Sequence, residues 1–191
     1  MDLFGSSLIP GLRLGDDLVG RADEEELIQR IAALPLAPFR FQGFTGKRLT
    51  HSFGWHYDFQ KQVLTRAEPI PPWLQPLQEK AARFAGIDPE EIMHALVIRY
   101  DPGAAIGWHR DRPVFDQVIG VSLGAPTVMS FRRRAAGRFR RLQLPLAPRS
   151  VYLLSGEARH DWEHSIRPHA QQRFSITFRT FAAHAKRLIH R

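Results

Sequence analysis

Apolar residues recur at helical spacing in two stretches of the N-terminal half. In Asp23–Ala33, acidic residues open the stretch and Leu27 and Ile31 fall on one face. The second stretch, Trp73–Ala85, follows a Pro-Pro pair and ends at Gly86, a residue typical of helix ends. Both patterns predict amphipathic helices that cover a sheet.

Beyond residue 93 the apolar runs become short and are separated by proline, glycine and charged residues. Six runs have the composition of strands: 95–100, 117–123, 127–132, 139–144, 151–154 and 174–181. Many short strands after two helices favour an α+β, mainly β fold, a jelly-roll barrel with the N-terminal helices packed on one side.

Residues 39–66 mix aromatic, polar and basic side chains between glycines, which predicts short strands that form a lid. Trp55 and Tyr57 could stack on nucleobases, and Lys47 and Arg48 could hold phosphates. An ordinary half-buried hairpin would have the same pattern.

The length of 191 residues suits one domain, with a barrel core over about 93–181. Hydrophobic residues make up 43% of the chain, enough for a packed core, and no uncharged apolar run is long enough to span a bilayer. Residues 1–14 show no secretory signal pattern. We expect a single domain over 1–191, monomeric, cytoplasmic and without a membrane partner.

The absence of cysteine excludes disulfides, thiolate metal sites and thiol nucleophiles, so any metal must use nitrogen and oxygen ligands. Charge is distributed unevenly. Residues 1–92 hold 10 Lys and Arg against 13 Asp and Glu, a net charge of −3, whereas residues 93–191 hold 17 against 6, a net charge of +11. Polyanions such as nucleic acid are natural partners for the basic part, although a solvated arginine face gives the same count.

A candidate metal site begins with His109 and Asp111. Side chains two residues apart share one face of an extended segment and can converge on a single ion. A later histidine would complete two imidazoles and one carboxylate, the triad that holds iron(II) with coordination positions left open. His164 fits that role, with His160 and His169 as rivals. Alone, the His-x-Asp pair would also suit a surface histidine beside a salt-bridged aspartate.

Two arginines follow on a predicted strand. Arg173 and Arg179 would point to one face with Ser175 and Thr177 between them. Arginines that face a barrel interior are costly unless carboxylates meet them, and a small dicarboxylate would satisfy both.

Four motifs in this order resemble the AlkB-like iron(II)- and 2-oxoglutarate-dependent dioxygenases. They are Ile98–Gly103 (IRYDPG), Ile106–Asp111 (IGWHRD), Trp162–Ile166 (WEHSI) and Arg173–Arg179 (RFSITFR). The resemblance spans about residues 39–181, and the ordered set is far more specific than any single motif.

The resemblance implies a double-stranded β-helix in which His109, Asp111 and His164 bind iron(II) and form the catalytic centre. It implies that Arg173 pairs with the distal carboxylate of the cosubstrate 2-oxoglutarate and that Tyr100 hydrogen-bonds to the same end. Arg179 would lie near the metal-bound end. With dioxygen, such enzymes oxidise N-methyl groups, which leave as formaldehyde. The implied substrate is an N-alkylated base, flipped or single-stranded, in DNA or RNA.

Two departures from the family pattern bear on this expectation. Ile98 stands where many members have an asparagine that contacts 2-oxoglutarate. Arg112, Pro113 and Val114 follow Asp111, without the acidic residue that helps related repair enzymes read a base. Two other functions therefore stay open: the same oxygenase chemistry on a protein or small molecule, and a nucleic-acid-binding module with weak catalysis.

The densest basic run surrounds a turn at residues 135–137, with Arg132, Arg133 and Arg134 before it and three arginines after it. A hairpin with arginine on both arms would grip phosphates at the edge of the active site. A solvated hairpin tip is the alternative.

Overall fold

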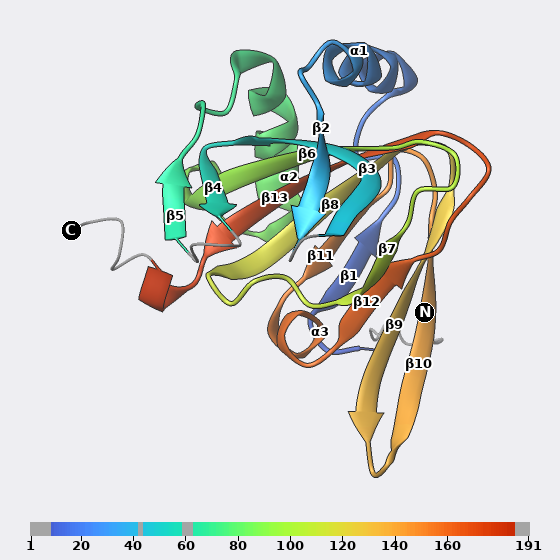
Figure 1. The fold of residues 1–191 in the computed structure, drawn as a ribbon. Helices are drawn as coiled ribbons and strands as arrows, with labels where there is room; N and C mark the ends of the chain where they lie inside the picture. Colours follow the sequence, from blue (N-terminus) through green and yellow to red (C-terminus); the bar gives the residue numbers. More distant parts are fainter. Residues whose placement is uncertain (1–8, 42–43, 59–62, 186–191) are drawn as a thin grey trace.

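Two antiparallel sheets lie face to face in the computed structural model, which describes residues 9–41, 44–58 and 63–185 (Figure 1). The large sheet has the order β1 (Leu12–Gly15), β11 (Val151–Leu154), β8 (Phe115–Gly124), β13 (Arg173–Phe181), β6 (Ile92–Tyr100), β3 (Phe44–Phe53) and β2 (Ala37–Phe41). The small sheet has the order β10 (Arg138–Leu146), β9 (Thr127–Ala135), β12 (Glu163–Ile166) and β7 (Ile106–His109). A separate ribbon pairs β4 (Trp55–Asp58) with β5 (Val63–Arg66).

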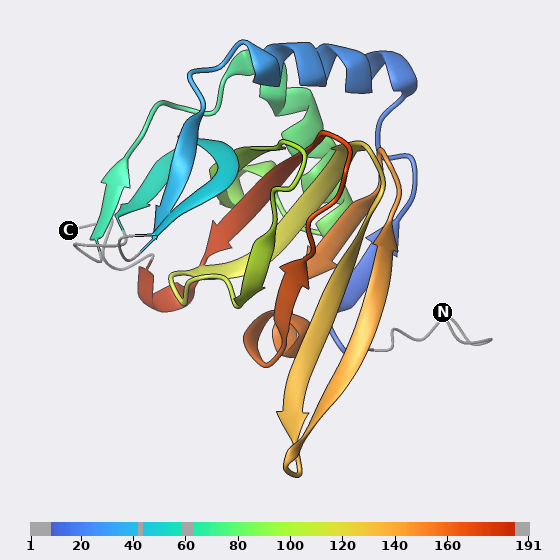
Figure 2. The same ribbon diagram turned by 45° about the vertical axis from the view of Figure 1, so that its right-hand side comes forward.

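Two helices cover the outer face of the large sheet (Figure 2). They are α1 (Arg21–Ala32) and α2 (Gln75–Ala85), the latter preceded by the 3-10 turn η1 (Pro72–Leu74). Gly86 ends α2 in the left-handed conformation, with φ 77°, which a residue with a side chain adopts at a cost. A second 3-10 turn, η2 (Pro89–Glu91), leads into β6.

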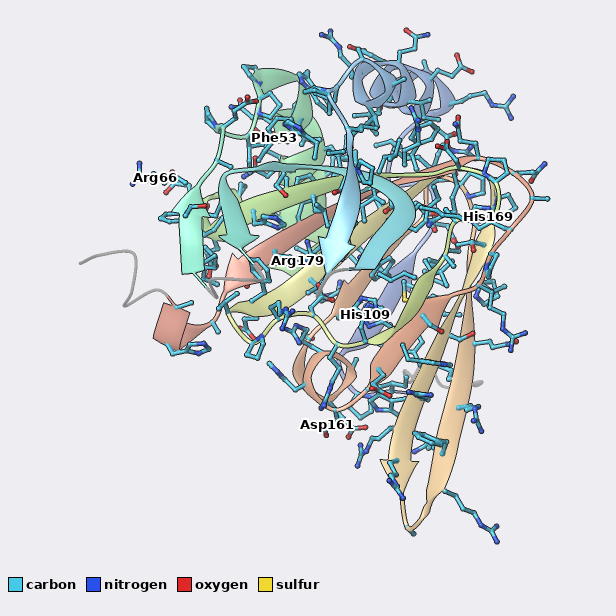
Figure 3. All side chains as sticks on the ribbon, in the orientation of Figure 1. Phe53, Arg66, His109, Asp161, His169 and Arg179 are labelled. Atoms are coloured by element: carbon cyan, nitrogen blue, oxygen red, sulfur yellow. The ribbon has the colours of Figure 1, made fainter. Side chains whose placement is uncertain are left out.

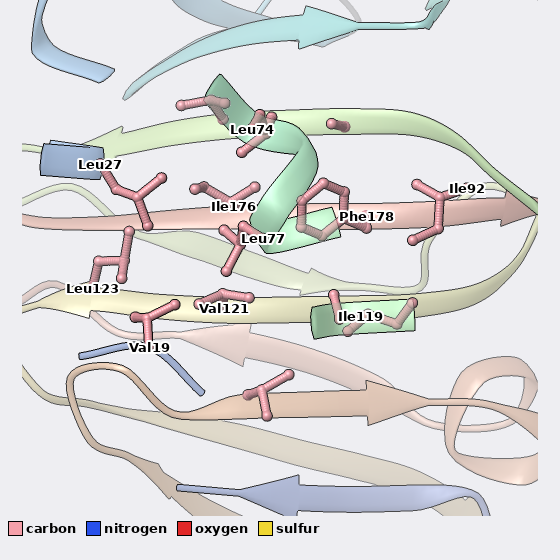
Figure 4. Packing of buried hydrophobic residues seen from close by; sticks show 14 of the residues in the cluster. Val19, Leu27, Leu74, Leu77, Ile92, Ile119, Val121, Leu123, Ile176 and Phe178 are labelled. Carbon is pink, nitrogen blue, oxygen red and sulfur yellow. The ribbon is translucent and has the colours of Figure 1, made fainter. Parts of the chain in front are cut away.

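The main core lies between these helices and the large sheet (Figure 4). Leu27 of α1 and Leu77 of α2 pack against side chains such as Val121 and Ile176 of the central strands. A second core fills the space between the sheets, where Val118 meets Phe131. The jelly-roll fold with helices on one side, predicted from the sequence, is confirmed. Its helical layer leaves the inner face of the large sheet free to build a site.

β13 lies between β6 and β8, and every residue in it is buried. Its apolar residues Phe174, Ile176 and Phe178 join the core beneath the helices. The alternate residues, which include Arg173 and Arg179, must therefore face the small sheet. The predicted alternation of this segment thus places both arginines in the interior.

All six predicted strand runs are strands, but three short elements went unpredicted. β7 and β12 have four residues each, and α3 (Gly156–His160) has five. Segments this short show too little periodicity to be recognised. The predicted lid also differs in part, because Leu49–Phe53 of β3 pairs with β6 and so extends the large sheet. Among the described residues, no helix is long and apolar enough to cross a membrane.

Candidate metal and cosubstrate site

Three predicted ligands meet at the edge of the small sheet. His109 ends β7 and His164 lies in β12, and the two residues are direct partners across the antiparallel pair. Their ring centroids are 4.3 Å apart. Asp111 follows β7, with Oδ2 at 3.6 Å from Nε2 of His164. Among the described residues this is the one group of three such side chains whose ligand atoms, all within 4.8 Å, could hold a metal ion.

Both histidines are poised as neutral ligands. Nδ1 of His109 donates to the carbonyl oxygen of Gly107 at 2.8 Å, which fixes the ring and leaves Nε2 for a metal. Burial lowers the pKa of His109 from its ordinary value. Burial, aided by repulsion from His109, lowers the pKa of His164 to about 3. A metal would therefore displace no proton from either imidazole at neutral pH.

Asp111 is ionised because Arg179 holds it. Burial alone would raise the pKa of this carboxyl, but the charge of Arg179, aided by that of Arg159, outweighs burial and keeps the pKa well below its usual range. Nε of Arg179 donates to Oδ1 at 2.8 Å, and Nη2 forms an ion pair with the same oxygen at 2.7 Å. Arg179 lies on the large sheet, and Asp111 directly follows the β7 strand of the small sheet that ends at His109 (Figure 3). The Arg179–Asp111 ion pair therefore connects the two sheets at the site.

Arg173 is a buried cation whose guanidinium is only partly hydrogen-bonded. Its side chain is 1% exposed, Nη2 donates to Oγ of Ser122 at 3.0 Å, and the guanidinium lies 4.7 Å from the centre of the Tyr100 ring. Nε and Nη1 are buried and have no hydrogen-bond partner among the described residues. Buried N–H groups of a cation that lack an acceptor favour an anion, and a carboxylate can supply one. The donor set at the triad and this incompletely paired guanidinium therefore fit iron(II) and a dicarboxylate such as 2-oxoglutarate.

Several residues that shape this interior carry no recognisable motif in the sequence. Ser122 lies opposite Ser175 of β13, and Gly120 lies opposite Thr177, so small side chains line the space between the two arginines. A Cβ on Gly120 would overlap the ring of Tyr152, which packs directly on that glycine. Burial raises the pKa of Tyr152, so its hydroxyl stays protonated.

Arg159 of α3 is a second residue without a sequence signal. It is 3% exposed, and Nη2 donates to the carbonyl oxygens of Arg112 and Phe115 at 2.6 Å and 2.7 Å. These carbonyls belong to the segment that directly follows Asp111. Because α3 leads into β12, Arg159 ties the segment that carries Asp111 to the one that carries His164.

The rival histidines lie outside the triad. His160 is exposed, with Nε2 at 3.5 Å from Asp116, and His169 donates from Nδ1 to the carbonyl oxygen of Gln171 at 2.5 Å. Neither joins His109 and Asp111 in the group that could hold a metal.

Among the predicted substrate contacts in the lid, Arg48 is partly buried. Burial lowers its pKa, and it interacts electrostatically with Arg179 and Asp111 of the site. Its guanidinium lies 4.0 Å from the centre of the Phe39 ring. Lys47 is exposed beside Gly103.

Two further lid predictions concern Trp55 and Tyr57. Trp55 packs edge-on against Phe181, with 5.7 Å between ring centroids. The side chain of Tyr57 lies outside the described residues.

The predicted arginine hairpin exists, formed by β9 and β10 around Ala136 and Gly137, both with positive φ. Arg132 pairs with Glu163 at 2.6 Å. Arg133 pairs with Glu157 at 2.6 Å. Arg134 is exposed and has no carboxylate within ion-pair distance among the described residues.

Comparison with known proteins agrees with this geometry. A profile of the 2OG-Fe(II) oxygenase superfamily matches residues 24–179. An Arabidopsis thaliana protein named "Alkylated DNA repair protein ALKBH8 homolog" is 30% identical over 194 aligned positions, which cover 88% of this chain and 54% of the relative. The human "Alpha-ketoglutarate-dependent dioxygenase alkB homolog 4" is 25% identical over 210 positions, 91% of this chain and 68% of the relative.

A mouse relative named "tRNA (carboxymethyluridine(34)-5-O)-methyltransferase ALKBH8" is 26% identical over 85% of this chain. The chain spans about a quarter of that relative and about half of the Arabidopsis one. Among solved structures, "The structure of OsALKBH1" matches 92% of this chain and all of the other with a TM-score of 0.68 at 16% identity, a likeness of fold.

Proposed function

The chain belongs to the 2OG-Fe(II) oxygenase superfamily, as an AlkB-like dioxygenase that uses iron(II), 2-oxoglutarate and dioxygen, and we propose that it oxidatively demethylates N-alkylated bases in DNA or RNA. The observation that carries the proposal is the guanidinium of Arg173, which is buried and has two nitrogens without a hydrogen-bond partner among the described residues. It supports a cosubstrate bound beside a metal.

Each residue of the interior has a definite part in this proposal. His109, Asp111 and His164 would hold the iron, and Arg173 would bind the distal carboxylate of 2-oxoglutarate. Arg179 keeps Asp111 ionised, so that the carboxylate can serve as an anionic ligand. When bound, iron and its cosubstrates supply the oxidation that hydroxylates an N-methyl group, with 2-oxoglutarate converted to succinate and carbon dioxide. The hydroxymethyl group then leaves nitrogen as formaldehyde.

The nucleic-acid part of the proposal draws on the charge of +11 carried by residues 93–191 and on Arg48, a lid cation that interacts electrostatically with Asp111. A relative named for alkylated DNA repair and another named for a tRNA uridine make both DNA and RNA relevant substrates to test.

The test is a panel of methylated DNA and RNA oligonucleotides, tRNA anticodon stem-loops included, incubated with iron(II) and 2-oxoglutarate and scored by mass spectrometry. We expect loss of a methyl group together with formaldehyde. His164→Ala should abolish this turnover, whereas His160→Ala, which removes an exposed histidine outside the triad, should not. Succinate production without any change in the oligonucleotides would refute the nucleic-acid proposal.

A second candidate is the same oxygenase chemistry on a protein side chain or small molecule. The observation that favours it is the sequence after Asp111, where Arg112, Pro113 and Val114 supply no acid to read a base. Failure of the protein to bind oligonucleotides at low salt, with cosubstrate turnover intact, would favour this candidate.

A further inference from the structure

The exposed large hydrophobic side chains of the described residues all lie on the small sheet. They are Trp108 of β7, Val128 of β9 and Phe139 of β10, with 37%, 42% and 41% of their surface exposed. Exposed aromatic and branched residues gathered on one element mark an interaction surface more often than isolated ones do.

These side chains share the outer face of that sheet. The guanidinium of Arg132 lies 4.5 Å from the centre of the Trp108 ring and 4.8 Å from that of Phe139, so one arginine stacks between two rings. Val128 precedes Arg132 by four residues on the same strand and therefore points to the same side. The neighbouring positions His109 and Phe131 face inward.

The arginine in this stack is fixed and neutralised. Nε of Arg132 donates to Glu163 of β12 at 2.6 Å, which sets the plane of the guanidinium. Cation–π contacts on both sides then hold the two rings in place. Trp108 and Phe139 thus present flat surfaces whose positions are set before any partner binds, which lowers the entropy cost of binding.

The charge around the rings identifies the partner. β9 and β10 contain no acidic residue, and by strand alternation Arg134 and Arg141 share the face of Arg132 and Phe139. Both are exposed, and among the described residues neither has a carboxylate within ion-pair distance. A second copy of this chain would place like charges against each other. A single-stranded nucleic acid offers phosphates to the arginines and bases to the rings.

We propose that the outer face of the small sheet, built on Trp108, Arg132 and Phe139, is a stacking platform for unpaired nucleotides that flank the reacting one. This inference rests on the proposed function. β7 is an edge strand with His109 on the inner face and Trp108 on the outer face, so a strand that leaves the site crosses one sheet edge to reach the platform. The β9–β10 hairpin projects beyond the rest of the molecule and so extends the outer face of the small sheet (Figures 1 and 2).

The test measures binding of the full chain to an unmodified, fluorescently labelled 15-nucleotide single strand, in DNA and RNA forms, by anisotropy over a range of salt. Phe139→Leu keeps apolar bulk but removes the ring, and we expect at least about a fivefold loss of affinity. Phe139→Tyr keeps the ring and should bind as wild type does. Arg141→Ala should flatten the plot of log affinity against log salt by about 0.7. Arg30→Ala, an equal charge change on α1, should alter neither quantity.

Equal affinity of wild type and Phe139→Leu would overturn the platform. A change of oligomeric state in Phe139→Leu, measured by sedimentation, would also overturn it, because the face would then join two copies. Because the probe carries no methyl group, the result is independent of demethylation. If Phe139→Leu loses binding and wild type demethylates none of the methylated oligonucleotides, the platform stands and the proposed activity is rejected. If Phe139→Leu binds as wild type does and wild type demethylates the oligonucleotides, the activity stands and the platform is rejected.

Discussion

Asp111 presents two unequal oxygens to its surroundings. Oδ1 accepts a hydrogen bond from Nε of Arg179 and forms an ion pair with its Nη2, whereas Oδ2 lies 3.6 Å from Nε2 of His164. A metal held by the triad would therefore find one free carboxylate oxygen and two imidazole nitrogens, which leaves coordination positions for a cosubstrate. Replacement of Arg179 would leave a buried carboxylate without its partner, a change that commonly costs about 3–5 kcal/mol.

Arg173→Ala should weaken 2-oxoglutarate binding about 10- to 100-fold, because charge-assisted hydrogen bonds contribute about 1.5–3 kcal/mol. Calorimetric titration of 2-oxoglutarate into the Mn(II)-loaded protein measures this. Arg167→Ala removes an exposed arginine from the neighbouring loop and is the matched control. An unchanged affinity in Arg173→Ala would remove this residue from the cosubstrate site.

Arg159→Gln should lower Mn(II) affinity about 10- to 100-fold, the usual cost of losing a group that orients metal ligands. The substitution removes two hydrogen bonds to the segment after Asp111. Arg110→Ala, which removes an exposed arginine bound only to the carbonyl of His160, should have a much smaller effect. A lower melting temperature with unchanged Mn(II) affinity would show that Arg159 serves stability alone.

At this scale the sequence reveals residues that act in short, ordered motifs. His109 and Asp111 are two positions apart, and Arg173 and Arg179 are six apart on one strand, so their shared faces follow from backbone periodicity. Arg159 could not be found this way, because its two carbonyl partners are more than 40 positions distant and the pairing exists only in the folded chain.

Among the elements, β8 and β11 show how the interior is kept open. Gly120 on β8 admits the ring of Tyr152 from β11, its direct partner across the pair. Any side chain there would displace the ring toward the space between Arg173 and the triad.

Gly120→Ala should therefore destabilise the protein by about 1–3 kcal/mol, the usual cost of overpacking a buried position. Urea unfolding measures the change. Gly107→Ala is the control, because a Cβ there would meet no atom within 4 Å. Equal stability of the two variants would show that Tyr152 has room to shift.

Element prediction succeeded where a segment was long enough to show a period. α1, α2 and the strands of nine or ten residues beyond residue 92 were found within a few positions. β7 and β12 lie outside the six predicted strand runs, since segments of four residues give too little alternation. These two strands carry the histidine ligands, so the ligand types were recognised before the elements that hold them.

At the scale of the whole molecule, we expect the fold to persist when no metal is bound. The largest core joins α1 and α2 to the outer face of the large sheet, on the side away from the triad. We expect that protein treated with a chelator keeps its far-ultraviolet circular dichroism. Mn(II) at a hundredfold excess over its dissociation constant should then stabilise the fold by about 2.7 kcal/mol. Loss of secondary structure on metal removal would contradict this expectation.

The overall architecture followed from the order of patterns, two helices and then many short strands. The order of the strands in the sheets could not be predicted from these patterns, because pairs such as β1 with β11 join segments about 140 residues apart. Whether the protein is monomeric, where it resides and whether 1–191 is one domain stay predictions from the sequence.

The direct pairing of His109 with His164 has a mechanical consequence. β7 is attached to the sheet on one side only, through four residues and an irregular register. A metal that binds both histidines would clasp this edge strand to β12. Amide hydrogen exchange across residues 106–109 should then slow when metal binds, and the Trp108 ring should become less mobile with it. Loading of the iron would thereby prepare the outer surface of the same strand to receive a substrate.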